Sequence, residues 1–463
     1  MRFQFVAVTL LASFGLAASL AAQAVSVPPI PFSEFKLNNG MRVILSEDHT
    51  LPVVTESMLF AVGGRNEPRG QSGFAHLFEH LMFEGSAHAP KGMFDHLVEG
   101  YGGTDNASTH EDYTFYFESV PSNVLETVMW LDADRLSALD VTQAAMQNQI
   151  KVVEEEKRLR VNNSPYGPLM YVDLQQQAFA NWQNAHPVIG SFKDLNAATL
   201  AQVRQFFDDY YAPRNCILTI VGDFDSAQVK PMVEKYFGWI PNRGKPLAVN
   251  TKEPQQAQPR RQTLHDALAK LPALTMSWHG PERGTRDFYA LTMLGQLLFS
   301  GQGSRLYQSL VKDHKVALQV DGGLGFPMGS YRDYLAPGLF AGLVVYKPNA
   351  NAQQIEGLVM QQIHQIEATG VSTETLHRLQ TKFASDWIRV QQTTLGRNQL
   401  LALATLFDGR PGDANTELAK FMDINSNDLE RVAQTYLTSA RLNLIVDLPG
   451  KPAAKTAAPG GQQ

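Results

Sequence analysis

The chain repeats part of its own pattern, and this repetition limits the folds that are open to it. The segment Leu81–Gly85 (LMFEG) returns as Leu297–Gly301 (LLFSG). A second segment, which begins at Thr199, returns near the end of the chain at Asp428 with the same spacing of apolar residues. Amphipathic helices can resemble each other by chance, but two echoes in the same order favour a duplication. With 463 residues available, we expect two similar domains.

Strand-like and helix-like patterns both occur in the first copy. Alternating or β-branched runs predict strands at Met41–Leu45, Val53–Ala61, Tyr113–Val120 and Ile217–Val221. Helical spacing of apolar residues predicts helices at Gly73–Glu84, Val124–Leu136, Thr142–Arg160 and Thr199–Tyr210. This mixture indicates an α+β fold in which sheets and helices form layers.

Both ends of the chain read as segments outside the folded domains. Residues 1–24 have a basic start at Arg2, an apolar run over Phe5–Leu20 and a small-residue cleavage pattern at Ala22–Ala24, as in a secretory signal peptide. The alternative is an uncleaved anchor, but the run is short for a membrane span of about 20 residues. No later stretch suits a membrane span. We therefore expect a mature chain without a membrane anchor, exported to the periplasm or secreted.

The rest of the chain divides at one change in composition. Between Pro241 and Arg261 the sequence is rich in Pro, Lys, Gln and Asn and has no periodicity, which is typical of a linker. We predict an N-terminal domain at 25–241, a linker at 242–261, a C-terminal domain at 262–449 and a disordered tail at 450–463.

Charge and cysteine content exclude two classes of function. Lys and Arg total 39 against 45 acidic residues, so the chain lacks the positive excess that follows a nucleic-acid backbone, and we expect no nucleic-acid partner. The single cysteine, Cys216, cannot build a thiolate metal cluster. Any metal must be held by histidine and carboxylate side chains.

The sequence His76-Leu-Phe-Glu79-His80 carries the strongest chemical signal. On a helix these three polar residues share one face, so two imidazoles one turn apart could hold a metal ion beside a carboxylate base. This is the H-x-x-E-H inverzincin pattern. Chance matches occur in long chains, but the second copy has Thr292, Gly295 and Gln296 at the equivalent positions. The fold therefore does not need the three residues.

Two histidines leave a zinc ion short of ligands, because catalytic zinc usually takes three protein ligands. The run Glu154-Glu155-Glu156 lies on the predicted helix Thr142–Arg160 and could supply the third. Helical periodicity does not choose among the three glutamates, and at least two of them are expected to face solvent.

These motifs together resemble the pitrilysin family of metallopeptidases, in the branch of mitochondrial processing peptidase and its bacterial relatives. The resemblance covers nearly the whole mature chain. Besides H-x-x-E-H, it rests on these segments in this order: Phe83–Gly85, Gly102-Gly103 with Asn106-Ala107, His186-Pro187 with Gly190, Tyr210–Pro213 with Asn215, and Val221–Asp223. The family's spacing from His80 to its metal-binding glutamate selects Glu156.

The resemblance implies two similar domains that face each other across a chamber, each a largely antiparallel sheet packed with helices. It implies Zn²⁺ on His76, His80 and Glu156, with Glu79 as general base and then general acid in peptide hydrolysis. Near Asn106 and Ala107 an extended peptide would add to a sheet edge. A turn role for Asn106 after the glycines is the alternative.

Two departures from the family pattern bear on activity. Gln149 stands where many relatives carry a glutamate that supports the metal ligands from behind. Val311 and Leu318 stand where self-sufficient relatives place an arginine and a tyrosine that reach substrate. We therefore expect an exported zinc endopeptidase that needs a homologous partner subunit with that pair, or a homodimer in which Arg305 or Tyr331 replaces it.

Two other functions compete with this expectation. One is a weakly active or non-catalytic subunit of a larger peptidase or binding complex. The other is a zinc hydrolase for a non-peptide ester or amide, which only the metal motif favours.

Overall fold

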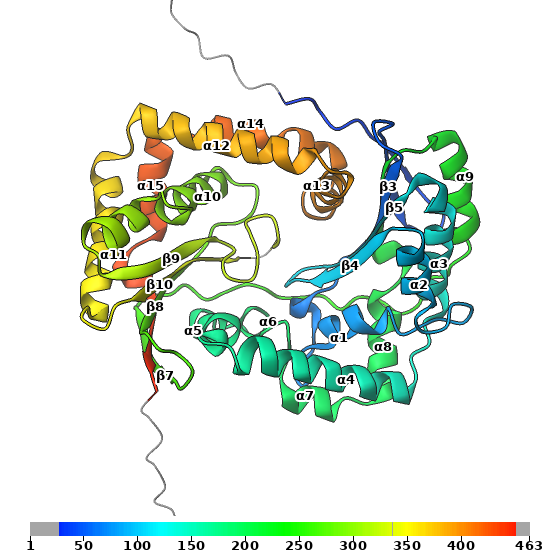
Figure 1. Ribbon diagram of the computed structural model, residues 1–463, viewed down its shortest axis with the longest axis horizontal. Coiled ribbons are helices and arrows are strands. Elements are labelled where there is room, and N and C mark those ends of the chain that lie inside the picture. The colour runs from blue at the N-terminus through cyan, green and yellow to red at the C-terminus, as the bar shows by residue number, and fades with distance from the viewer. Residues whose placement is uncertain (1–26, 336, 451–463) are drawn as a thin grey trace, which may run out of the picture.

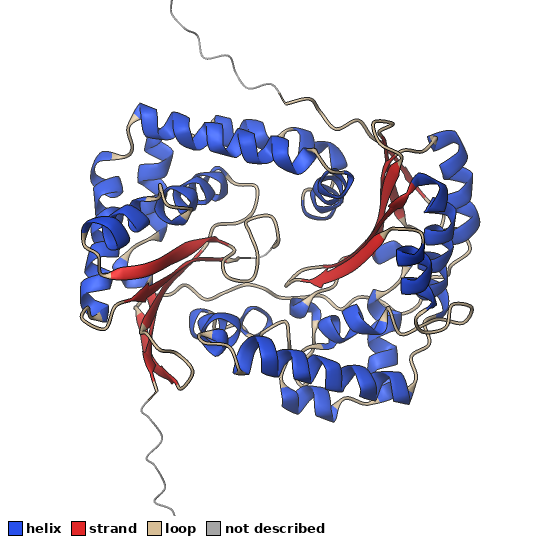
Figure 2. Cartoon of the chain, viewed as in Figure 1, coloured by secondary structure: helices blue, strands red, loops and turns tan. Residues whose placement is uncertain are grey.

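The computed structural model describes residues 27–335 and 337–450, and two separate sheets organise them (Figures 1 and 2). The predicted signal peptide at 1–24 and the tail beyond Gly450 lie outside the described residues. Among the described residues, no helix combines the length and apolar character that crossing a membrane requires.

The first sheet has six strands and belongs to the first half of the chain. Its strands are β1 Ser33–Lys36, β2 Arg42–Glu47, β3 Val53–Phe60, β4 Thr104–Thr109, β5 Thr114–Pro121 and β6 Cys216–Gly222. The helices of this half are α1 Phe74–Leu81, α2 Met93–Gly100, α3 Leu125–Ala138, α4 Gln143–Lys157, α5 Leu174–Ala178, α6 Trp182–Ala185, α7 Phe192–Ala197, α8 Leu200–Tyr210 and α9 Ser226–Phe237. The four strands and four helices expected from the sequence are all present within a few residues of their predicted limits.

The second sheet has five strands and belongs to the second half. Its strands are β7 Arg260–Asp266, β8 Ala273–His279, β9 Ala317–Leu324, β10 Leu339–Tyr346 and β11 Asn443–Pro449. The helices are α10 Arg286–Phe299, α11 Ala352–Thr369, α12 Thr373–Gln391, α13 Thr394–Phe407, α14 Glu417–Met422 and α15 Ser426–Tyr436. No helix or strand is assigned between Phe237 and Arg260, although β7 takes the last two residues of the predicted linker. The domain limits stay a prediction.

The two sheets share one topology. The strand orders are β1-β2-β6-β3-β5-β4 and β7-β11-β8-β10-β9, so the second sheet repeats the first without β1. In each sheet one pair is parallel, β2 with β6 and β7 with β11, and the remaining pairs are antiparallel. The duplication and the α+β fold with two similar domains are confirmed. Each sheet ends on an edge strand, β4 or β9, that points toward the middle of the molecule in Figure 1.

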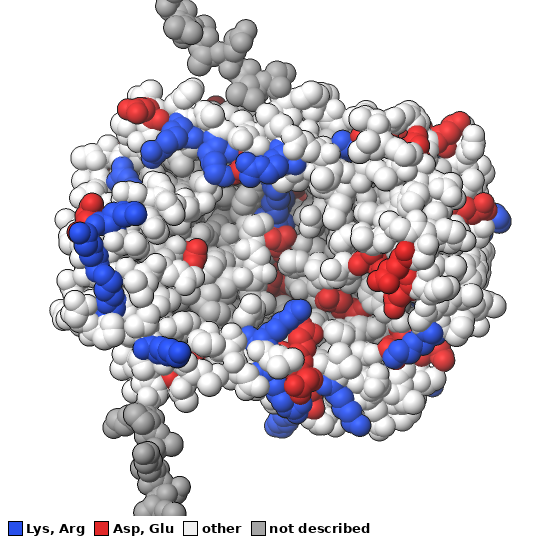
Figure 3. Space-filling model, in the orientation of Figure 1, with Lys and Arg blue, Asp and Glu red and all other residues white. Residues whose placement is uncertain are grey.

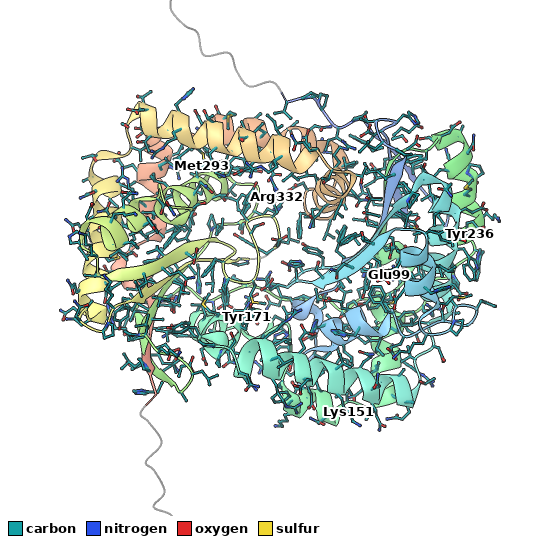
Figure 4. All side chains as sticks on the ribbon, in the orientation of Figure 1. Glu99, Lys151, Tyr171, Tyr236, Met293 and Arg332 are labelled. Carbon is teal, nitrogen blue, oxygen red and sulfur yellow. The ribbon has the colours of Figure 1, made fainter. Side chains whose placement is uncertain are left out.

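In each half, one helical segment packs against the sheet of the other half. On α13, Asn398 donates from Nδ2 to the carbonyl oxygens of Thr55 (3.1 Å) and Thr219 (2.8 Å) in the first sheet. In return, Leu169 packs against β8, β10 and β11, and Leu174 and Ala178 on α5 pack against β10. Figure 4 labels Tyr171 on the same segment. This exchange joins the two domains through buried side chains.

Candidate active site

Helix α1 carries the H-x-x-E-H residues and is anchored by its apolar face. Phe74, Leu77, Phe78 and Leu81 are fully or almost fully buried in the core of the first domain. The opposite side of the helix leaves His76 buried and Glu79 and His80 partly exposed. The two imidazole rings lie with their centroids 5.0 Å apart and their planes at 90°.

Helix α4 brings a carboxylate to these two rings. Thr142 caps its first turn by accepting from the Ala145 N–H, and Met146, Ile150 and Val153 bury its inner side. Glu156 Oε2 then lies 3.6 Å from His76 Nε2 and 3.3 Å from His80 Nε2. One atom from each of these three residues lies within 4.8 Å of the others, as a shared metal ion requires.

The three neighbouring glutamates on α4 have different surroundings. Glu154 accepts a hydrogen bond from Asn196 and pairs with Arg158, and Glu155 is exposed beside the same arginine. Only Glu156 of the three faces the histidines. The spacing taken from the family resemblance and the geometry therefore agree on one residue, which periodicity left open.

The protonation states of His76 and Glu156 favour metal binding. Burial is the largest effect on His76 and lowers its pKa despite the nearby charges of Glu79 and Glu156, so the ring is neutral at neutral pH. Burial acts to raise the pKa of Glu156, but the hydrogen bond with His80 and the positive charge of Arg160 act against it, and the pKa is lowered. Neutral imidazoles and an ionised carboxylate are the forms that bind zinc.

The donor set also fits zinc by its chemistry. Two imidazole nitrogens and one carboxylate oxygen are the ligands of known catalytic zinc sites, which keep a further position open. Arg160 Nη1 lies 2.7 Å from the second oxygen of Glu156, so one carboxylate oxygen faces the histidines while the other is held. The described residues thus match the group that the sequence motif implies.

Thr109 is a site residue that the sequence did not single out. Its Oγ1 donates a hydrogen bond of 2.6 Å to Glu79 Oε2, from the last residue of β4 to the middle of α1. A threonine at the end of a polar segment has no distinguishing pattern, so only the packing of α1 on β4 could reveal it.

A buried carboxylate holds the N-terminus of α1. Glu67 accepts from the N–H groups of Gly73 and Ala75, both at 2.8 Å, and so caps a helix whose own N-cap residue has no side chain. His186 Nε2 lies 3.0 Å from the same carboxylate. The other ring nitrogen of His186 lies 2.7 Å from the carbonyl oxygen of Trp182, to which it must donate. A proton must therefore lie between His186 Nε2 and Glu67.

The segment from His186 to Gly190 also ties α1 to α4. Gly190 has a φ of +74° and packs so closely on Gly73 that an added Cβ would lie 2.5 Å from the Gly73 Cα. Its carbonyl oxygen accepts a hydrogen bond from the Lys157 ammonium, next to Glu156. One short segment therefore sets the spacing of the helices that carry the histidines and the glutamate.

The other residues predicted for the site have hydrogen-bond partners other than the metal ligands. Asn106 and Ala107 lie within β4 itself, an edge strand, and Asn106 Oδ1 accepts from the Ala107 N–H at 2.8 Å. Gln149 Nε2 donates to Glu84 Oε1 at 2.5 Å. Lys91 lies 2.6 Å from the same oxygen of Glu84.

The second domain has a cavity at the place equivalent to the metal motif, and its lining includes no histidine. A cavity of about 330 Å³ is lined by Thr292, Gly295 and Gln296 on α10 and by Asp386 on α12. Asp386 stands as far beyond its N-cap Ser372 as Glu156 stands beyond Thr142. Arg332, which Figure 4 labels, also lines this cavity. The duplicated fold thus keeps the space and one carboxylate, but no imidazole.

The positions of the missing arginine and tyrosine are filled by apolar side chains. Val311 is half-buried against the core of the second domain, and Leu318 on the edge strand β9 is 51% exposed. Tyr331 packs edge-on against Phe288 and Phe421, so its ring belongs to an aromatic cluster of the second domain.

The face shown in Figure 3 is hollowed near its middle. Acidic side chains lie in and beside the hollow, and basic side chains gather along α12.

Family models match both halves of the chain. Residues 42–190 match the model described as Insulinase (Peptidase family M16), and residues 197–383 match the model described as Peptidase M16 inactive domain. The chain belongs to peptidase family M16. This confirms the pitrilysin resemblance, since the site described above lies in the first matched region.

M16 relatives include named zinc proteases. The chain is 28% identical over 413 residues to the zinc protease PqqE of Helicobacter pylori, over 88% of this chain and 91% of that protein. The crystal structure of a protease from Helicobacter pylori is similar, with a TM-score of 0.85, 26% identity and coverage of 91% of this chain and 100% of that one. The periplasmic protease PqqL of Escherichia coli shares the fold at 19% identity and a TM-score of 0.72, over 91% of this chain and 48% of that one.

The Glu67–His186 pair makes a testable contribution to stability. Burial acts to lower the pKa of His186, but the hydrogen bond and charge of Glu67 outweigh it and raise the pKa. The stabilisation is therefore full below about pH 6.5, the ordinary histidine value, and is lost as the pH rises through the raised folded-state pKa. In EDTA, thermal unfolding should show Tm falling from pH 6 to 9 by roughly 2–6 °C more in the wild type than in His186→Gln.

The control for this prediction is His377→Gln, the same change at an exposed position of α12. It should leave the pH profile of the wild type unaltered. Parallel profiles for the wild type and His186→Gln would show that the pair does not share a titrating proton.

Proposed function

We propose that the chain is a zinc-dependent endopeptidase that acts on peptides or unfolded segments. The observation that carries this proposal is the convergence of His76, His80 and Glu156 from two helices, with Glu79 on the same helix turn as the histidines. The names of the M16 relatives support the same reaction class.

The residues of the site would have distinct roles in hydrolysis. Bound zinc would supply Lewis acidity, which polarises a peptide carbonyl and acidifies a water molecule. His76, His80 and Glu156 would hold the ion. Glu79 would take the proton from the attacking water and pass it to the departing amine nitrogen as the C–N bond breaks.

The edge of the first sheet would hold the substrate. β4 pairs only with β5 among the described strands, so its other side offers backbone N–H and C=O groups to an extended peptide. The Nδ2 group of Asn106 remains available for a substrate carbonyl, because Oδ1 is already paired with Ala107. Binding through backbone groups suits many sequences, which is consistent with an endopeptidase of broad specificity.

We also propose that the protein is exported, with residues 1–24 as a cleaved signal peptide. The periplasmic protease that shares the fold is compatible with this location.

A second candidate is a subunit with weak or no activity of its own. It is favoured by Val311 and Leu318, neither of which can donate a hydrogen bond to a substrate carbonyl. The description of the matched C-terminal model as an inactive domain applies to that half of the chain, which lacks the three motif residues.

Glu79→Gln should keep zinc and lose hydrolysis. An amide cannot take a proton from water, and general base catalysis contributes about 10²–10⁴-fold in rate. Zinc analysis beside a quenched-peptide assay checks this, with Glu99→Gln as the matched control at an exposed position of α2, labelled in Figure 4. Substantial turnover by zinc-loaded Glu79→Gln would reject the mechanism.

Glu156→Gln should strip most of the zinc from the protein. Removal of a ligand should cost more than the roughly 10–100-fold loss of metal affinity that follows when a residue behind the ligands is changed. Glu155→Gln is the control, because that side chain is exposed beside Arg158. Zinc loss in Glu155→Gln but not in Glu156→Gln would show that Glu155, and not Glu156, is the third zinc ligand.

The isolated chain should be slow, and a homologous subunit that lacks H-x-x-E-H but carries the arginine and tyrosine should activate it. Loss of one such donor typically costs about 10²–10³-fold in rate. Co-expression, size-exclusion chromatography and a peptide assay test the partner against a homodimer. Full activity of the isolated chain, unchanged by the homologue, would refute the need for a partner.

A further inference from the structure

The hydrogen bond from Thr109 to Glu79 connects two parts of the proposed reaction. Thr109 is the last residue of β4, whose edge would pair with a peptide, and Glu79 is the proposed base. At 2.6 Å the contact is typical of a hydroxyl that donates to an ionised carboxylate. No other hydrogen bond to the Glu79 carboxylate is found among the described residues.

The position of Thr109 is fixed from both of its sides. Its Cα pairs with that of Thr114 on β5, and Thr114 Oγ1 donates to the carbonyl oxygen of Val62 at 2.8 Å. The turn that follows is held by Asp112, which accepts from Arg65 at 2.5 Å and from the Leu335 N–H of the second domain at 2.7 Å. Thr109 therefore belongs to an ordered strand end.

A hydroxyl donor in this position makes the two oxygens of Glu79 unequal. Oε2 already accepts a hydrogen bond from Thr109, so Oε1, which accepts none among the described residues, is the better placed to take a proton from water. The hydrogen bond also restrains the side-chain torsions of Glu79. Placement of a reacting group within a narrow range of geometry is a large part of enzymatic rate enhancement.

We propose that Thr109 is a positioning residue that orients the Glu79 carboxylate and links it to the strand on which a substrate would dock. This inference rests on the proposed peptidase function. A peptide paired along β4 would order that edge strand up to its last residue. The hydrogen bond from Thr109 Oγ1 would then restrain the Glu79 carboxylate as well. A substrate too short to pair with β4 would gain less from the link.

The test compares Thr109→Val, which keeps the shape but removes the donor, with Thr109→Ser, which keeps the donor. Loss of a hydrogen bond to a charged group corresponds to a fall of about 10–100-fold in kcat for Thr109→Val, with KM changed less than about twofold. Thr109→Ser should recover kcat to within about threefold of the wild type. Both variants should retain zinc, and Tm should fall by no more than about 5 °C in Thr109→Val.

A crystal structure of each zinc-loaded variant gives a readout that does not depend on activity. The Glu79 carboxylate should leave its wild-type position in Thr109→Val and keep it in Thr109→Ser. An unchanged kcat in Thr109→Val, a rise in KM alone, or a carboxylate that stays in place without the donor would overturn the inference. A wild type that binds zinc but cleaves no peptide would refute the proposed function instead. The position of the Glu79 carboxylate in the two variant structures would still show whether Thr109 orients it.

Discussion

The candidate site depends on the fixed spacing of two helices that are far apart in the sequence. His76 and His80 lie on α1 and Glu156 lies on α4, so the three side chains meet only if both helices are held. The segment from His186 to Gly190 holds them, through Glu67 at the N-terminus of α1 and through Lys157 at the end of α4. The close approach of Gly190 to Gly73 leaves no room for a side chain at either glycine.

This constraint explains why some residues of the site could be predicted from the sequence and others could not. The histidines and Glu79 follow from a short helical motif, because their spacing alone places them on one face. Glu156 needed the family's spacing as well, since helical periodicity did not separate it from Glu154 and Glu155. The contacts show why: the three differ in their distant partners, not in their local pattern.

The remaining site residues could not be predicted from the sequence, because their roles depend on partners that are distant in the chain. Glu67 and Thr109 act through partners in other elements, which no local pattern indicates. The strand β4 was missed as well, because its polar sequence after two glycines resembles a turn. Single strands and helices were predicted well. The packing of α13 and α5 on the sheet of the other domain was not, because it depends on contacts such as that of Asn398 with Thr219, 179 positions apart in the sequence.

The duplication separates what the fold requires from what the site requires. Both sheets keep one strand order and an edge strand toward the middle, yet within the part of the chain that the structure describes only the first domain carries imidazoles beside its carboxylate. In the second domain the same place holds Thr292, Gln296 and Asp386 around a cavity. The three motif residues are therefore additions to a scaffold that folds without them, which is what a catalytic role predicts.

The most direct test is a zinc-edge anomalous diffraction measurement on crystals of the zinc-loaded protein. The account predicts one strong anomalous peak per chain, bound by Nε2 of His76, Nε2 of His80 and a carboxylate oxygen of Glu156, with Glu79 beside the ion and not bound to it. A peak at other residues, zinc bound by Glu79, or a zinc-loaded protein with no peak between α1 and α4 would contradict it.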